Sequence, residues 1–290
     1  MTGCGPTICS AWRRPEQAVK RPSPSLDAEP DPGADNSFKT PDPTTGPRTA
    51  DFGFQAVPEA DKVNRVGAVF SSVAPRYDLM NDLMSGGLHR LWKAFTVELC
   101  GLRPGQRVLD VAAGTGDLAL KLWPRVMPGG EVVLADINES MLLRGRDRLL
   151  DAGMPAGAIL CNAEQMSFVS DHFDCITIGF GLRNVTRKEH ALREMHRLLR
   201  PGGRLIVLEF SRVQRALAPL YDAYSFAVLP LLGRLVARDS ASYRYLAESI
   251  RVHPDQNQLR DLFVQAGFER VEYFNLAAGV VAVHRGFKLC

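Results

Sequence analysis

The glycine-rich turn in LDVAAGTGDLA (109–119) constrains the fold of this chain more than any other stretch. It follows the apolar run RVLDVA (107–112), which predicts a buried strand, and it leads into GDLALKLW (116–123), which predicts a helix. Gly114 and Gly116 let the backbone turn tightly and approach a ligand, and the start of the helix offers free N–H groups. This order indicates an α/β fold that binds a nucleotide-like ligand at the turn.

Strands and helices alternate along the rest of the chain. Further strands are predicted at EVVLAD (131–136), AILC (158–161), DCITIGF (174–180), GRLIVLEF (203–210), FERVEYFNL (268–276) and GVVAVHRGFKL (279–289). Helices are predicted at 140–150, with Ser140 as N-cap, and at 187–200, where Pro201-Gly202-Gly203 ends the helix. We therefore expect a Rossmann-like, mostly parallel sheet of seven strands with helices on both faces.

The first 50 residues differ in composition from the rest. They hold nine of the 19 prolines, six basic and six acidic residues, and almost no periodic apolar pattern. Such a segment buries too little surface to offset the entropy of ordering, and its acids are not typical of a transit peptide. We expect a disordered extension over 1–50. Residues 51–290 are expected to form one domain, with N-terminal helices over 61–100 and a helical lid insertion at about 212–250.

The bulk composition excludes several classes of function. The 35 basic and 32 acidic residues give a formal charge of +3 and are spread along the chain, so nucleic acid is not an expected partner. The six cysteines form no C-x-x-C pair, and the six histidines form no H-E-x-x-H motif. We therefore expect no metal site and no disulfide framework. We also expect the protein to function in a reducing compartment.

Two acidic residues indicate which ligand binds at the glycine-rich turn. Asp136 ends the second predicted strand 20 residues after Gly116, where a carboxylate can bind both ribose hydroxyls. Asp110 stands four residues before Gly114, which suits the cationic S-adenosylmethionine better than the pyrophosphate of NAD. The pair Asn162-Ala163 follows the third strand, where an adenine would lie, although an ordinary loop asparagine is an equal alternative.

Longer motifs carry a family resemblance. They are SVAPRYDLMNDLMSGGLHRLWK, DVAAGTGDLAL, LADINESML, CNAEQMSF, FGLRNVTRKEHALREMHRLLRPGGRLIVLEFS, YDAYSFAVLP, SYRYLAESIRVHPDQ and AGVVAVHRGFKL. Together they cover roughly 52–289 and resemble the quinone-biosynthesis C-methyltransferases, the ubiquinone/menaquinone methylase family. The resemblance implies a class I S-adenosylmethionine-dependent methyltransferase fold. It also implies methyl transfer to the ring of a polyprenylated benzoquinol, a demethylmenaquinol or both.

The resemblance also implies where the cofactor is held. Its contacts fall on Thr115 of the glycine turn, on Asp136 and on the pair Asn162-Ala163. The family commonly has a serine in the fourth strand where this chain has Gly179, which leaves only a backbone contact there.

Catalytic residues are expected after the fourth strand and near the amino-terminal helices. Arg183 is expected to stabilise a phenolate or to orient a water, with Asn184 positioning that water; a surface salt bridge to a neighbouring acid is the alternative for Arg183. Tyr77 and Asp78 are the candidates for a substrate gate and an acid-base group, although Asp78 could equally be a helix cap. Further candidates with weaker support are His89, Tyr221, Asp222 and Tyr224.

Two apolar segments, 77–93 and 224–237, are expected either to contact a prenyl chain or to form ordinary core. The second is too short to span a bilayer, so a cytoplasmic protein is expected, with peripheral contact to the inner membrane left open. Association with other quinone-biosynthesis enzymes is also left open. The alternatives to the enzyme are a cofactor-binding scaffold without activity and a methyltransferase for another acceptor.

Overall fold

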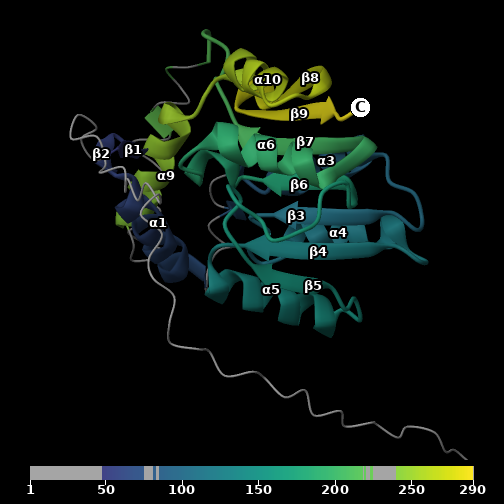
Figure 1. Cartoon of the computed structure of the whole chain (residues 1–290). Coiled ribbons are helices and arrows are strands. Elements are labelled where there is room, and N and C mark those ends of the chain that lie inside the picture. The colour runs from purple at the N-terminus through teal and green to yellow at the C-terminus, as the bar shows by residue number, and fades with distance from the viewer. Residues whose placement is uncertain are drawn as a thin grey trace, which may run out of the picture. The chain divides into compact units, whose positions relative to one another are not determined.

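The computed structural model describes residues 48–74, 81–82, 85–217, 219, 223–224 and 240–289 (Figure 1). The predicted extension therefore lies outside the described residues, except for its last three. Strand β1 (Thr49–Phe52) pairs antiparallel with β2 (Gln55–Pro58), so regular structure begins just before the expected domain start. This hairpin has no counterpart among the predicted elements.

The main sheet has seven strands, as predicted. They are β3 (Arg107–Val111), β4 (Glu131–Asp136), β5 (Gly157–Leu160), β6 (Phe173–Gly179), β7 (Leu199–Phe210), β8 (Glu269–Leu276) and β9 (Val281–Phe287). Their order is β5-β4-β3-β6-β7-β9-β8. The first five strands are parallel, and β9 runs antiparallel to both β7 and β8. The strand order reverses between β3 and β6, and ligands bind at such a switch point in open α/β sheets.

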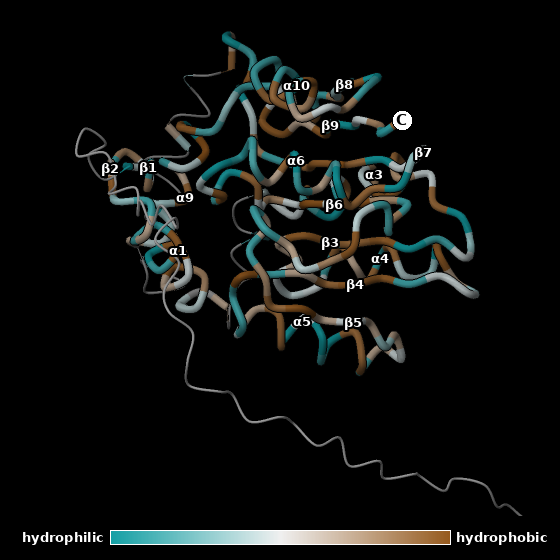
Figure 2. Tube along the Cα trace, viewed as in Figure 1, coloured by the Kyte–Doolittle hydropathy of each residue, from teal (hydrophilic) through white to brown (hydrophobic). Residues whose placement is uncertain are grey.

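Helices cover both faces of the sheet (Figure 1). On one face α3 (His89–Cys100), α4 (Asp117–Val126) and α5 (Glu139–Asp151) share a buried apolar cluster with Val108 and Leu134. On the other face α6 (Lys188–Leu198) and α10 (Gln256–Gln265) pack on Leu109 and Ile176. Hydrophobic residues concentrate along β3, β4 and β6 in Figure 2 because these strands are covered on both sides.

Two helices lie at the carboxyl ends of the parallel strands, beside the β1–β2 hairpin. They are α1 (Glu59–Val73) and α9 (Ser240–Val252) (Figure 1). Both fall in regions for which helices were predicted from sequence. None of the helices in the described ranges is long and apolar enough to cross a membrane.

Helix ends differ in detail from the sequence predictions. The N-cap of α5 is Asn138, whose side chain accepts a hydrogen bond from the N–H of Met141, so the prediction of Ser140 was wrong. Asparagine caps as well as serine does, and here it stands directly before the first helical residue. Helix α6 ends at Leu198, because Leu199 is already extended and begins β7.

Candidate functional site

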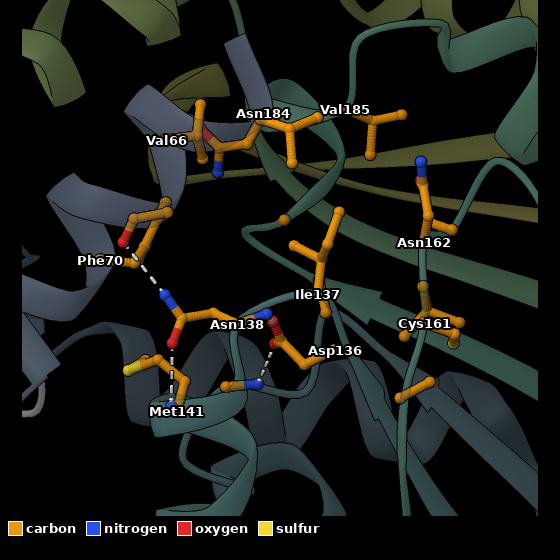
Figure 3. Close-up of a pocket in the computed structure, with 18 of the residues that line it drawn as sticks. Val66, Phe70, Asp136, Ile137, Asn138, Met141, Cys161, Asn162, Asn184 and Val185 are labelled. Carbon is orange, nitrogen blue, oxygen red and sulfur yellow. Dashed lines mark hydrogen bonds between the residues drawn. The ribbon is translucent and has the colours of Figure 1, made fainter. Parts of the chain in front are cut away.

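A pocket lies where β3, β4 and β6 end, with α1 along one side (Figure 3). Its empty volume, open mouth included, is about 860 Å³. Most of its lining is apolar, and its polar side chains come from the strand ends. This is the place and the character expected of a cofactor site in an open α/β sheet.

The glycine turn forms the inner edge of this pocket. Gly114 and Gly116 have φ angles of 55° and 73°, in the left-handed region that favours glycine. Helix α5 packs directly on the turn through Gly145, where a Cβ would lie 2.7 Å from the carbonyl oxygen of Gly114. The turn therefore depends on a third glycine, 29 positions after Gly116 in the sequence.

Asp136 lies at the centre of the polar lining, at the end of β4. Its Oδ2 accepts a hydrogen bond from the N–H of Gly114, and its Oδ1 accepts one from the N–H of Asn138, both at 2.8 Å. Burial raises the pKa of this carboxyl, and the hydrogen bonds from backbone N–H groups oppose that shift. Each oxygen keeps a second lone pair, so the carboxylate can still accept from a ligand in the pocket.

Asn138 connects the wall that carries Asp136 to helix α1. While its Oδ1 caps α5, its Nδ2 donates to the carbonyl oxygen of Gly67 at 3.1 Å and to the Oγ of Ser71 at 3.0 Å. Figure 3 shows Val66 and Phe70 of α1 facing the pocket across from Asp136. Sequence reasoning missed this wall, because no local pattern relates α1 to a strand end so far along the chain.

The segment after β5 forms the opposite wall. Cys161, Asn162 and Ala163 line the pocket. Figure 3 shows the first two on this wall. The Cys161 N–H donates to the carbonyl oxygen of Asp136 at 2.9 Å, which fixes this wall to β4. Burial raises the pKa of the Cys161 thiol to about 11, so the thiol is protonated at neutral pH.

Asn184 closes the pocket on the side of β6. It belongs to the 3₁₀ turn η2 (Leu182–Asn184), and its Oδ1 accepts a hydrogen bond from the hydroxyl of Tyr245 at 3.0 Å. That bond directs the Nδ2 of Asn184 as the group available for donation to a ligand. Tyr245 of α9 was not predicted as a site residue.

Arg183 lies elsewhere than the sequence suggested. Its guanidinium is buried, pairs with Glu209 of β7 at 2.8 Å and donates to the carbonyl oxygen of Phe180. Its backbone N–H also donates to Glu209, at 3.1 Å, and the guanidinium lies over the ring of Phe210. Arg183 is not among the residues that line the large pocket. The surface salt bridge given as the alternative for Arg183 was wrong, because its partner Glu209 lies in β7 and both side chains are buried.

Four expected cofactor residues also lie outside the lining of this pocket, namely Asp110, Thr115, Gly116 and Gly179. Asp110 is only 1% exposed and accepts a hydrogen bond from the Thr177 hydroxyl at 2.7 Å. Burial raises the pKa of Asp110 to about 7, so this carboxyl is largely neutral below that pH. The Thr115 hydroxyl is buried without a hydrogen-bond partner in the described chain. Gly179 directly precedes Phe180, which does line the pocket.

The remaining candidates divide into two groups. Tyr77, Asp78, Tyr221 and Asp222 lie outside the described residues, as does most of the apolar segment 224–237. His89 is 5% exposed, and its Nε2 lies 2.9 Å from Asp82, which also binds Arg90. This contact gives His89 a structural role at the start of α3.

Comparison with known proteins matches residues 58–288 to the model of the ubiE/COQ5 methyltransferase family. A protein of Pseudomonas entomophila named ubiquinone/menaquinone biosynthesis C-methyltransferase UbiE is 60% identical over 243 residues, which are 83% of this chain and 95% of that protein. The protein of the same name from Laribacter hongkongensis is 59% identical over 83% of this chain and 99% of its own length.

Solved structures share the fold at low sequence identity. A Thermotoga maritima S-adenosylmethionine-dependent methyltransferase, described as a possible histamine N-methyltransferase, is 21% identical with a TM-score of 0.54 over 76% of this chain and 99% of that one. The [4+2]-cyclase SpnF is 19% identical with a TM-score of 0.55 over 75% of this chain and 76% of its own. The two descriptions name different activities, so these likenesses establish the fold alone.

Proposed function

The chain belongs to the ubiE/COQ5 methyltransferase family, and from this premise we propose that it methylates a ring carbon of a polyprenylated quinol with S-adenosylmethionine. Both a benzoquinol and demethylmenaquinol are proposed acceptors, since the relatives are named for ubiquinone and menaquinone biosynthesis alike. The observation that carries the proposal is the buried carboxylate of Asp136 beside the glycine turn, in a pocket large enough for a nucleoside.

The proposed cofactor site uses the walls on either side of Asp136. The carboxylate would accept from the ribose hydroxyls with the lone pairs that Gly114 and Asn138 leave unused. The adenine would lie between Ile137 and the pair Asn162-Ala163, all three of which line the pocket. Ribose hydroxyls donate hydrogen bonds and the Asp136 carboxylate accepts them, so the polar lining of the pocket fits the sugar of this cofactor.

When bound, S-adenosylmethionine supplies an electrophilic methyl group on a sulfonium sulfur. The quinol carbon becomes nucleophilic when a neighbouring hydroxyl ionises, because the oxyanion pushes electron density to the ring. In the proposed reaction a carbon–carbon bond would form as the carbon–sulfur bond breaks, and the ring would then lose the proton of the methylated carbon to a water molecule. The chain must therefore stabilise a phenolate, orient the ring and exclude bulk water.

Asn184 is the proposed contact to the acceptor oxygen. Its Nδ2 can donate toward the pocket while Tyr245 holds the other end of the amide. Arg183 is proposed as the positioning residue, since its ion pair with Glu209 fixes the turn that carries Asn184. Tyr77 and Asp78 stay proposals for the acceptor side, and Asp110, Thr115 and Gly179 stay proposals as supports beneath the cofactor.

A direct assay tests the proposal. The purified chain should transfer the labelled methyl of S-adenosylmethionine to a short-tailed demethylmenaquinol and to the corresponding benzoquinol. Asn184→Ala should retain cofactor binding and lose turnover. Arg193→Ala, at an exposed position of α6, is the matched control and should keep full activity. Cofactor binding without any methyl transfer would favour the scaffold alternative.

We propose peripheral membrane contact as well, because the acceptor carries a polyprenyl tail. Leu88 and Leu91, one helical turn apart at the start of α3, are 44% and 67% exposed and give this end of the helix a small apolar surface. Sedimentation with phospholipid vesicles checks this proposal. Leu91→Ser should reduce the bound fraction, whereas exposed Val264→Ser on α10 should not. Residues 51–290 are proposed as a single domain, to be tested by limited proteolysis.

A further inference from the structure

A second, smaller cavity lies on the other side of the turn that carries Asn184. Its empty volume is about 260 Å³, and β1, α1, η2, α6 and α9 surround it. The polar and charged groups that line it include Asp51, Lys62, Arg183, Lys188, Tyr245 and His253. The cavity is therefore small and polar, in contrast to the apolar pocket in front of it.

Two lysines converge in this cavity. The Nζ of Lys62 and the Nζ of Lys188 both donate to the carbonyl oxygen of Val185, at 3.5 and 3.2 Å. Lys62 is 3% exposed, and neither ammonium group forms an ion pair with an acid in the described parts of the chain. Burial and the charge of Lys188 lower the pKa of Lys62 to about 8. Lys188 is only half-buried, but the two ammonium groups share one neutral acceptor and repel each other, and a bound anion would relieve that repulsion.

Two further donors in the cavity have no protein partner. Both ring nitrogens of His253, which is 9% exposed, lack a hydrogen bond within the described residues, and so does the Nε of Arg183. Burial lowers the pKa of His253 well below its usual value, so the ring is neutral and carries one N–H. A buried polar group without a partner destabilises the fold, so two such residues in one cavity point to a ligand that is held there.

Acids also surround the two lysines, but only one of them lines the cavity. Glu209 is paired with Arg183, and Glu164 is paired with Arg187 at 2.6 Å. Glu59 and Glu189 act on Lys62 and Lys188 respectively from outside the lining. Within the lining, the two lysines therefore share a single acid, Asp51.

We propose that this cavity binds a small tetrahedral oxyanion of the phosphate class, held by Lys62, Lys188 and His253. Its donors come from three different elements, and a tetrahedral anion has oxygens in that many directions, whereas a carboxylate has two in one plane. The small volume excludes a nucleotide. The oxyanion is distinct from the methyl donor and the quinol, whose proposed pocket lies on the other side of η2.

The position of the cavity gives the oxyanion an effect on the large pocket. The carbonyl that now receives both lysines belongs to Val185, and Val185 and Asn184 line the large pocket. When the two lysines bind an oxyanion, the carbonyl oxygen of Val185 loses two hydrogen-bond donors. The bound anion then lies next to the η2 turn. The oxyanion thereby helps to set the conformation of the segment that carries Asn184.

Calorimetric titration of the full chain tests the site, without methyl donor or quinol, so that the result is independent of the proposed catalysis. Inorganic phosphate is the probe, sulfate is its non-titrating analogue, and acetate and chloride at matched ionic strength are the controls. Wild type should bind phosphate and sulfate. Lys62→Met and Lys188→Met should each weaken binding about tenfold or more, which corresponds to one charge-assisted hydrogen bond.

Methionine keeps the apolar stem of lysine and removes a buried charge, so both variants are expected to fold, and circular dichroism checks this. Lys121→Met, on α4 and outside the cavity, is the matched control and should bind phosphate as wild type does. His253→Asn gives an independent variant should either lysine variant unfold, and it too should bind more weakly. Equal phosphate affinity in all folded variants, or no binding by wild type, overturns the proposal. Acetate binding as tight as phosphate binding overturns the tetrahedral assignment.

Discussion

The side-chain amide of Asn138 donates a hydrogen bond to the carbonyl oxygen of Gly67 at 3.1 Å and thereby joins the strand end that carries Asp136 to helix α1. The two residues are 71 positions apart in the sequence. This bond and its neighbour to Ser71 hold one wall of the large pocket against another, while the same asparagine caps α5. A single side chain thus determines both a helix start and the width of the pocket.

Asn138→Ala should lower the free energy of unfolding by about 1–2 kcal/mol through loss of the cap and should also weaken cofactor binding. Ser71→Ala removes one bond to α1 and leaves the cap, so it should lower cofactor affinity with a stability loss of about 0.5–1 kcal/mol. Urea denaturation and calorimetry measure the two effects. Ser140→Ala is the control, since its hydroxyl bonds to Asn138 and does not reach α1. Unchanged cofactor affinity in Asn138→Ala would contradict the role assigned to α1.

Asp136→Ala should reduce affinity for S-adenosylmethionine about 100-fold or more, because the ribose loses a charged acceptor in a buried site. Asp147→Ala removes a carboxylate whose side chain is 58% exposed and pairs with Arg146, so its affinity should match wild type. Isothermal titration with S-adenosylmethionine measures the affinity of both variants and of wild type. Wild-type affinity in Asp136→Ala would remove the nucleoside from this pocket.

Gly145→Ala should disturb the glycine turn. Its Cβ would lie 2.7 Å from the Gly114 carbonyl oxygen and 3.1 Å from the Gly116 nitrogen, so helix α5 would have to move away. We expect a loss of stability of about 1–3 kcal/mol and a weaker cofactor complex. Gly179→Ser is the contrasting change, because a Cβ there meets Leu118 at an ordinary 3.6 Å. Thermal unfolding should give Gly179→Ser a midpoint close to that of wild type and Gly145→Ala a lower one. A lower midpoint for Gly179→Ser than for Gly145→Ala would contradict the packing argument.

Glu209→Gln should destabilise the fold by about 3–5 kcal/mol, since it leaves the buried guanidinium of Arg183 without its counter-charge. The double variant Arg183→Met with Glu209→Gln should recover part of this loss. A double-mutant cycle in urea measures the coupling. Asp261→Asn, which breaks an exposed pair with Arg260, is the control and should cost much less. Additive effects of the two changes at 183 and 209 would show that the buried pair has no special role.

Asp110 should make stability depend on pH. Burial raises its folded pKa from 3.8 to about 7, so the folded state holds more protons than the unfolded state between those values. Its contribution is fully present below pH 3.8 and is lost as pH rises toward 7, by an amount on the order of a few kcal/mol. Asp110→Asn should abolish this loss, so its stability relative to wild type should increase from pH 5 to pH 8. Parallel pH profiles of the two proteins would contradict the assignment.

Much of the fold could be predicted because its signals are local. The strand at 131–136 and the glycine turn each depend on a few neighbouring residues, and both lie where they were expected. Asp136, Asn162 and Asn184 could be predicted to lie at this edge of the sheet for the same reason, since each ends or closely follows a predicted strand. The carboxyl ends of parallel strands meet at one edge, so their residues come together without further information.

The features that sequence reasoning missed depend on distant contacts. The partner of Arg183 is Glu209, 26 positions away in what reads as an apolar strand. Gly145 supports a turn that lies in another βα unit, and α1 reaches the pocket only through Asn138. Asp110 was assigned to the cofactor from its spacing alone, but the direction of its side chain depends on the pairing of β3 with β6, which places Thr177 beside it.

The two walls of the large pocket differ in what a substitution would disturb. Asp136, Asn138 and Asn184 each bind other elements, so changing any of them propagates into the sheet or α9. Val63 and Val66 of α1 also face the pocket, but a change at either alters its shape while the backbone of α1 stays tied to Asn138. Val63 and Val66 are therefore positions where the shape of the pocket can be altered with the contacts that hold Asp136 left in place.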